Sequence, residues 1–141
     1  MTPPEIIAKL EAAERGSRDL TADVYQAFGF SVIRTPRRPG GIAWRYRGHM
    51  ESRWLSMRDL TESLDAALTL VPEGWRLHIL AEHYSGWSAN LRRKFGSEAA
   101  DEAVWKRGHH WPSEHSSGTV EKIATAPLAL CVVAIKARSA S

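Results

Sequence analysis

Two short runs of alternating apolar and polar residues constrain the fold of this chain more than any other feature. Every second residue is apolar, namely Trp75, Leu77, Ile79 and Ala81 in the first run and Trp87, Ala89 and Leu91 in the second. A period of two is that of a half-buried β-strand. Because Ser85 and Gly86 separate the runs, the sequence predicts an antiparallel hairpin of residues 75–84 and 87–94.

Helical patterns precede this hairpin. Thr2 and Glu5 have the spacing of a capping box, and Pro3 stands at the first helical position. Gly16 is placed to end this helix, and Thr21 is a candidate N-cap for a second one.

Two further helices are predicted after residue 60. Residues 61–70 (TESLDAALTL) have helical spacing, and the Pro-Glu-Gly sequence of residues 72–74 predicts the turn that follows. Thr125 is expected to cap a last helix. Its core face would hold Leu128, Cys131, Val132 and Ile135.

Helices at both ends and a hairpin between them indicate the α+β class. We expect an antiparallel sheet, built on the 75–84/87–94 hairpin and covered by helices, as an α-β-α sandwich. A length of 141 residues predicts a single domain, 1–141. Within it, residues 34–58 and 96–122 have the character of insertions.

The segment 34–58 is strongly basic. It contains seven arginines and one acid, Glu51, so it carries +6, whereas the whole chain carries +3. Residues 30–33 predict a short strand and 35–41 a loop. Ile42, Trp44 and Tyr46 then alternate with Ala43, Arg45 and Arg47, which is the period of a half-buried strand.

Arginine interleaved with aromatic residues is typical of protein interfaces and of nucleic-acid binding. The candidate binding residues are Arg37, Arg38, Trp44, Arg45, Tyr46, Arg47 and Arg53. A protein partner is favoured over nucleic acid, because +6 is modest for a nucleic-acid reader. The alternative is that these residues have no binding role. They would then form a solvent-exposed strand face on which the aliphatic parts of the arginine side chains cover the sheet.

A histidine cluster in RGHHWPSEH, residues 107–115, raises the question of a metal site. Its candidate ligands are His109, His110, Glu114 and His115, to which His83 of the hairpin could be added. Adjacent histidines point apart, and no established zinc-ligand spacing is present. We therefore expect no metal and no cofactor, with His110, Glu114 and His115 as weak candidates only. Cys131 is expected to pack in the core rather than to act as a nucleophile.

Three stretches resemble a known family. They are LEAAERGSRDLTADVYQAFG (10–29), TESLDAALTLVPEGWRL (61–77) and TAPLALCVVAIKAR (125–138). Together they resemble the phage ABA sandwich domain, a family of small phage and prophage proteins. The resemblance implies an α-β-α layered fold and no particular activity. It does not extend to 34–58 or to 96–122.

These observations favour a non-enzymatic phage or prophage accessory protein that binds a host or phage protein. One form of such a function is inhibition of a host defence system. The alternatives are a nucleic-acid-binding module that uses 34–58 and a metal-dependent hydrolase that uses His109, His110 and His115.

The composition also bears on where the chain works. No apolar run approaches the ~20 residues of a membrane span, and the N-terminus does not resemble a secretory signal. A lone cysteine, Cys131, fits a reducing compartment. We expect the cytoplasm of a bacterial host and no membrane partner, and leave homo-oligomers open.

Overall fold

The computed structural model describes residues 2–37, 40–48, 50–93 and 120–139. These residues form four helices and two three-stranded antiparallel sheets, so the predicted α+β class is confirmed. We call β1-β2-β3 sheet A and β4-β5-β6 sheet B. In chain order the elements are α1 (Pro3–Ala12), α2 (Arg18–Ala27), β1 (Ser31–Pro36), β2 (Ile42–Arg47), β3 (Leu55–Ser56), α3 (Leu64–Leu68), β4 (Trp75–His83), β5 (Gly86–Arg93), β6 (Val120–Ile123) and α5 (Ala126–Ser139).

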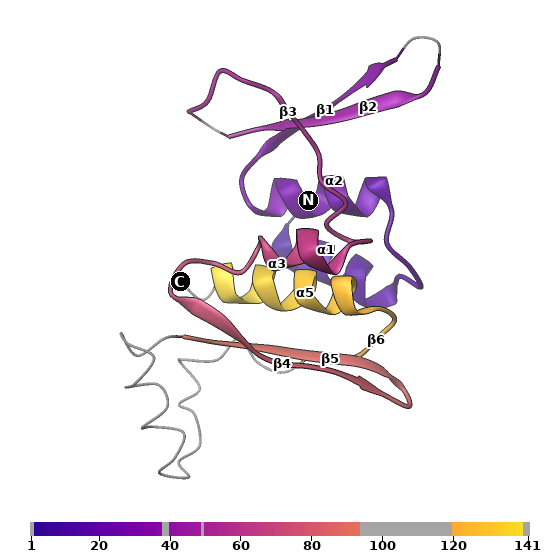
Figure 1. Ribbon diagram of the computed structural model, residues 1–141, viewed down its shortest axis with the longest axis vertical. Helices are drawn as coiled ribbons and strands as arrows, with labels where there is room; N and C mark the ends of the chain where they lie inside the picture. The colour runs from indigo at the N-terminus through magenta and orange to yellow at the C-terminus, as the bar shows by residue number, and fades with distance from the viewer. Residues whose placement is uncertain (1, 38–39, 49, 94–119, 140–141) are drawn as a thin grey trace.

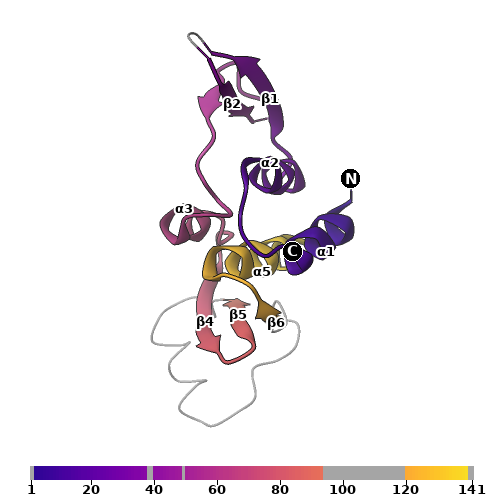
Figure 2. The same ribbon diagram turned by 90° about the vertical axis from the view of Figure 1, so that its right-hand side faces the viewer.

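The described helices lie between the two sheets. Sheet A lies beyond α2 at one end of the molecule, and sheet B packs on α5 at the other (Figure 1). α1 and α3 lie beside α5, on the side away from sheet B, and the view in Figure 2 shows the same order. The layers therefore run sheet, helices, sheet along the long axis of the molecule. Helices cover the sheet of the predicted hairpin, but the order differs from the expected α-β-α sandwich because residues 31–56 form a second sheet.

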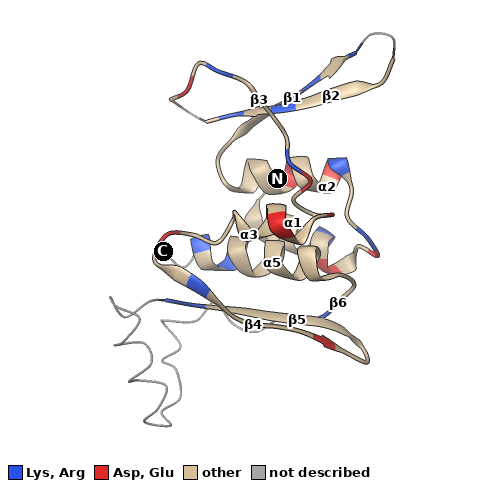
Figure 3. Ribbon diagram, in the orientation of Figure 1, with Lys and Arg blue, Asp and Glu red and all other residues tan. Residues whose placement is uncertain are grey.

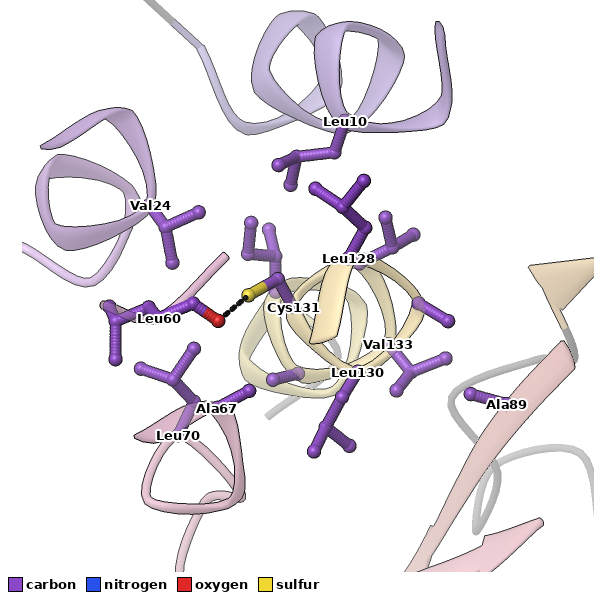
Figure 4. Packing of buried hydrophobic residues seen from close by; sticks show 14 of the residues in the cluster. Leu10, Val24, Leu60, Ala67, Leu70, Ala89, Leu128, Leu130, Cys131 and Val133 are labelled. Atoms are coloured by element: carbon purple, nitrogen blue, oxygen red, sulfur yellow. Dashed lines mark hydrogen bonds between the residues drawn. The ribbon is translucent and has the colours of Figure 1, made fainter. Parts of the chain in front are cut away.

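Helix α5 is the centre of the core. Each residue from Leu128 to Ile135 is at most 1% exposed. The predicted core face of this helix is confirmed, but its opposite face is buried as well, because α1 and α3 cover what sheet B does not (Figure 4). The predicted N-cap is also present: the Leu128 N–H donates to Thr125 Oγ1 at 3.4 Å.

The predicted hairpin is confirmed, with Tyr84 and Ser85 as its two turn residues. Its simple alternation is wrong beyond Leu77, because a register shift leaves His78 as an extra residue. After this bulge Leu80 packs against the core in place of Ile79.

Residues assigned to insertions also take part in the sheets. The end of the predicted insertion 96–122 belongs to β6, which pairs with β5 and makes β5 the middle strand of sheet B. The other predicted insertion, 34–58, provides most of sheet A. Neither segment is therefore wholly separate from the regular structure.

The boundary between α1 and α2 differs from the prediction. α1 ends at Ala12, and α2 begins after Ser17, whose Oγ accepts a hydrogen bond from the Leu20 N–H at 3.1 Å. Gly16 therefore does not end a helix. A Cβ atom at Gly16 would overlap the carbonyl oxygen of Thr61, so glycine is required there by the close approach of two backbone segments.

Thr21, the predicted N-cap, is instead fully buried and hydrogen bonded to Thr61. Thr61 Oγ1 donates to the Ser17 carbonyl at 2.9 Å and accepts from the Ser17 N–H at 3.0 Å. Thr21 Oγ1 must then donate to Thr61 Oγ1 (2.8 Å), and it accepts from the Thr61 N–H at 3.3 Å. Both buried hydroxyls are thus satisfied, and they join the start of α2 to the segment before α3.

The same network shortens the third helix. Its predicted span, 61–70, contracts to Leu64–Leu68 because Thr61 is engaged with Ser17 and Thr21, and Ser63 becomes the cap by accepting from the Ala66 N–H at 3.3 Å. The predicted turn that follows is confirmed, with Gly74 at a φ of +86°.

Gly16→Ala tests the close approach of Gly16 to Thr61. The added methyl group should lower the free energy of unfolding by about 3 kcal/mol or more, because backbone rather than a flexible side chain must move. Gly40→Ala is the matched control, since no atom lies within 4 Å of a Cβ there. It should leave stability unchanged or raise it by less than about 1 kcal/mol. Equal denaturant midpoints for the two variants would contradict this packing.

Candidate functional site

The arginine-rich segment folds into sheet A. β1 and β2 pair antiparallel over their whole length, and the two residues of β3 pair with Arg45 and Tyr46. β1 is longer than the predicted strand 30–33, because it continues through Thr35 and Pro36, which we expected in a loop. Proline is tolerated there because β1 is an edge strand of sheet A. At the tip of the hairpin the Arg37 N–H donates to the Gly41 carbonyl at 3.0 Å.

The two faces of sheet A differ in chemistry. Trp44 and Tyr46 pack towards α2, on what we call the inner face, and their partners in β1, Arg34 and Val32, share that face. The intervening residues of β2, Ala43, Arg45 and Arg47, belong to the opposite, outer face. Within β2 the aromatic residues and the arginines are therefore separated by the pleat, whereas Arg34 of β1 shares the face of Trp44.

Tyr46 attaches sheet A to α2. Its ring stacks on Tyr25 of α2, with 4.3 Å between centroids, and meets Phe30 edge-on at 5.3 Å. Burial raises the pKa of Tyr25, whose hydroxyl oxygen accepts a hydrogen bond from the Arg58 N–H at 3.1 Å. The ring of Tyr46 is thus engaged in packing sheet A on the helix.

A cleft of 390 Å³ lies at the side of sheet A where β3 ends. It brings together three of the predicted binding residues, Arg37, Trp44 and Arg45, and adds Arg18 from the start of α2. Its apolar lining includes Ile42, which is 55% exposed. No carboxylate is among the described residues that line the cleft, although Arg18 forms an ion pair with Asp59 at 3.1 Å.

A second hollow, of 450 Å³, lies between α2 and the inner face of β1. Trp44 contributes to both hollows, and the guanidinium of Arg34 lies 5.2 Å from the centroid of its ring. Positively and negatively charged side chains line this hollow, among them Asp23, which forms an ion pair with Lys9 at 2.7 Å. Trp44 therefore stands between a basic cleft and a mixed polar hollow.

The remaining predicted binding residues lie apart from these hollows. Arg47 stacks on Trp54, with 4.6 Å to the ring centroid, and Arg53 is exposed in the segment before β3. Arg38 lies outside the described residues. In Figure 3 basic residues mark both strands of the β1–β2 hairpin, and the acidic residue of this part of the chain, Glu51, lies in the segment between β2 and β3.

Sequence reasoning missed the contribution of Arg18 and Ile42. Ile42 was visible as part of the alternation in β2, but its exposure follows from its place at the end of the hairpin, beyond α2. Arg18 carries no local signal, because only the tertiary fold brings the start of α2 to the cleft.

The histidine cluster His109, His110, Glu114 and His115 lies outside the described residues. Among the residues that are described, no group of three or more His, Cys, Asp or Glu side chains could hold a metal ion. His83 instead bonds through Nε2 to Ser88 Oγ at 2.7 Å.

Cys131 packs in the core, as expected. It is fully buried, and its Sγ donates to the Leu60 carbonyl at 3.3 Å (Figure 4). Burial raises the pKa of this thiol to about 12, so that it stays protonated at neutral pH. A thiolate nucleophile needs the opposite environment, electropositive and accessible.

The chain was compared with known proteins and with known folds. No protein-family model, no curated protein and no solved structure matches it. The resemblance to the phage ABA sandwich domain therefore rests on the three sequence stretches alone. Within the described residues no helix is both long and apolar enough to cross a membrane.

Cys131 gives a direct test of the buried thiol. At pH 8 its alkylation by iodoacetamide should be about 1,000-fold or more slower in the native protein than in denaturant, because reaction requires unfolding. The raised pKa also stabilises the folded state below the unfolded thiol pKa of about 8.5, and this contribution should be lost as the pH rises towards 12. Similar alkylation rates in native and denatured protein would contradict the packing.

Proposed function

We propose that this protein is a non-enzymatic binding protein whose sheet A docks on an acidic surface of a host or phage protein. The observation that carries the proposal is the cleft lined by Arg18, Arg37 and Arg45 together with Trp44 and the exposed Ile42. Arginine and tryptophan are the residue types that most often dominate protein interfaces, and the cleft combines them with an apolar surface that can be desolvated.

The positive charge of the cleft indicates that the partner surface is acidic. Its lining contains three guanidinium groups and no carboxylate among the described residues, and Asp59 neutralises only Arg18. An acidic surface would supply the missing counter-charges, and a guanidinium can bind a carboxylate through two parallel hydrogen bonds. Charge complementarity of this kind also increases the association rate.

The arrangement of the aromatic rings favours a protein over nucleic acid. Single-stranded nucleic acids bind through aromatic faces on which bases stack, beside basic grooves that follow the phosphates. Here Tyr46 is packed against Tyr25 and Phe30, and Arg34 lies over the ring of Trp44. The arginines of sheet A also belong to two faces and a hairpin tip rather than to one row.

The division of the molecule supports binding through sheet A. The core is built on α5 and sheet B, whereas Arg37 and Arg45 are exposed on the β1–β2 hairpin. Substitutions on the outer face of sheet A can therefore alter binding without unfolding the protein. The resemblance to phage proteins supports an accessory role in a bacterial cytoplasm, and occlusion of a host defence protein is one concrete form.

Charge reversal tests this function. Arg45→Glu should weaken binding to the partner at least about tenfold, whereas Arg15→Glu should leave it unchanged, because Arg15 is exposed and does not line the cleft. The two variants change the net charge equally. The measurement is quantitative affinity purification from cells of the source organism, followed by titration of the purified partner.

Two results would count against the proposal. A partner that binds both variants equally well would remove sheet A from the interface. Binding of generic single-stranded DNA or RNA at physiological salt, lost in Arg45→Glu but not in Arg15→Glu, would favour the nucleic-acid alternative.

A further inference from the structure

One hydrogen bond in sheet A shows which backbone groups of β1 point to its outer edge, the edge that is not paired with β2. The Trp44 carbonyl accepts from the Met57 N–H at 3.1 Å, so the backbone groups of Trp44 point away from β1. Opposed residues in an antiparallel pair exchange either both hydrogen bonds or neither. Arg34, which is opposite Trp44, therefore directs its N–H and carbonyl away from β2.

The same alternation applies along the whole strand. Val32 also directs its N–H and carbonyl to the outer edge, and Pro36 adds a carbonyl there but has no N–H. No hydrogen bond from the described residues reaches these groups. β1 thus presents two donors and three acceptors in the spacing that an added strand requires.

The hollow between α2 and β1 lies beside this edge. Val32 and Arg34 line it from the strand, and Ala22 and Asp23 line it from the helix. In a strand added to β1, every second side chain would point to the inner face, towards this hollow. Backbone pairing and a side-chain hollow are the two elements of peptide recognition by strand addition.

We propose that the acidic partner contributes an extended segment that pairs with β1 as a fourth strand of sheet A. This inference rests on the proposed function and specifies how the partner binds. The segment would place apolar side chains beside Val32 on the inner face, over the hollow between β1 and α2. Its carboxylates would then lie on the outer face, beside Ile33 and Thr35 of β1 and one strand removed from Arg45 of β2.

Charge disfavours a second copy of this chain as the occupant in the pairing centred on Arg34. Antiparallel pairing of two β1 strands centred on Arg34 would set Arg34 of one copy opposite Arg34 of the other, with Arg37 of each close by. Like charges directly opposite one another destabilise a strand pair. A partner strand of different sequence that carries acidic residues avoids this repulsion and complements the charge of the basic cleft.

The experiment uses a fluorescein-labelled ten-residue peptide of alternating valine and glutamate, with binding measured by fluorescence anisotropy. Arg34→Pro removes the guanidinium and the outward N–H, whereas Arg34→Ala removes the guanidinium alone. Neither substitution takes a hydrogen bond from the β1–β2 ladder, because the Arg34 N–H points outward. We expect Arg34→Pro to bind the peptide about tenfold more weakly than Arg34→Ala.

A second measurement does not depend on any substitution in the protein. The same peptide, N-methylated at every residue, keeps its side chains and charges but has no backbone donor. We expect it to bind the wild-type protein at least about tenfold more weakly than the parent peptide. This comparison decides the matter if circular dichroism shows that Arg34→Pro does not fold.

Three outcomes would overturn strand addition. These are no binding of the parent peptide, equal binding by folded Arg34→Pro and Arg34→Ala, and tighter binding of a ten-nucleotide oligothymidylate than of the peptide. The second outcome would leave the proposed function standing, because Arg45→Glu tests that function independently. Loss of partner binding in Arg34→Pro but not in Arg45→Glu would instead retain strand addition and reject the basic cleft.

Discussion

The burial of α5 on every side is the constraint on which the rest of the structure depends. A helix that is apolar all round cannot lie at the surface, so it needs a sheet on one side and helices on the others. Sheet B covers one side of α5, and α1 and α3 cover the others. Cys131 shows how complete this enclosure is, because its thiol is sealed from solvent and bonded to the carbonyl of Leu60.

Sheet A is held by a different set of contacts, which explains why it can serve binding. Tyr25, Phe30 and Tyr46 pack it on α2, and the buried hydroxyls of Thr21 and Thr61 fix α2 to the segment before α3. The outer face of sheet A contributes nothing to the core around α5. Arg45 on this face is exposed and can meet a partner, whereas the inner face carries the packing.

Local patterns predicted the elements whose structure depends on local causes. The hairpin of residues 75–84 and 87–94 follows from its period of two, and α5 follows from its cap at Thr125 and its apolar residues. The features that were missed depend on contacts between distant residues. Gly16 has the sequence context of a helix end, yet Thr61, far along the chain, determines its role. The bulge at His78 likewise has no local signal. For the candidate site, the alternation in β2 already implies that Trp44 and Arg45 point to opposite faces, but only the fold brings Arg18 to them.

The central claim is that sheet A binds while α5 and sheet B maintain the fold. Hydrogen–deuterium exchange of the whole chain, alone and saturated with its purified protein partner, tests it most directly. The account predicts slower exchange on binding in β1 and β2, with the amides of Val32 and Arg34 among those protected, and unchanged exchange in β4 and α5. Protection gained in β4 and β5, with none in β1 and β2, would contradict it.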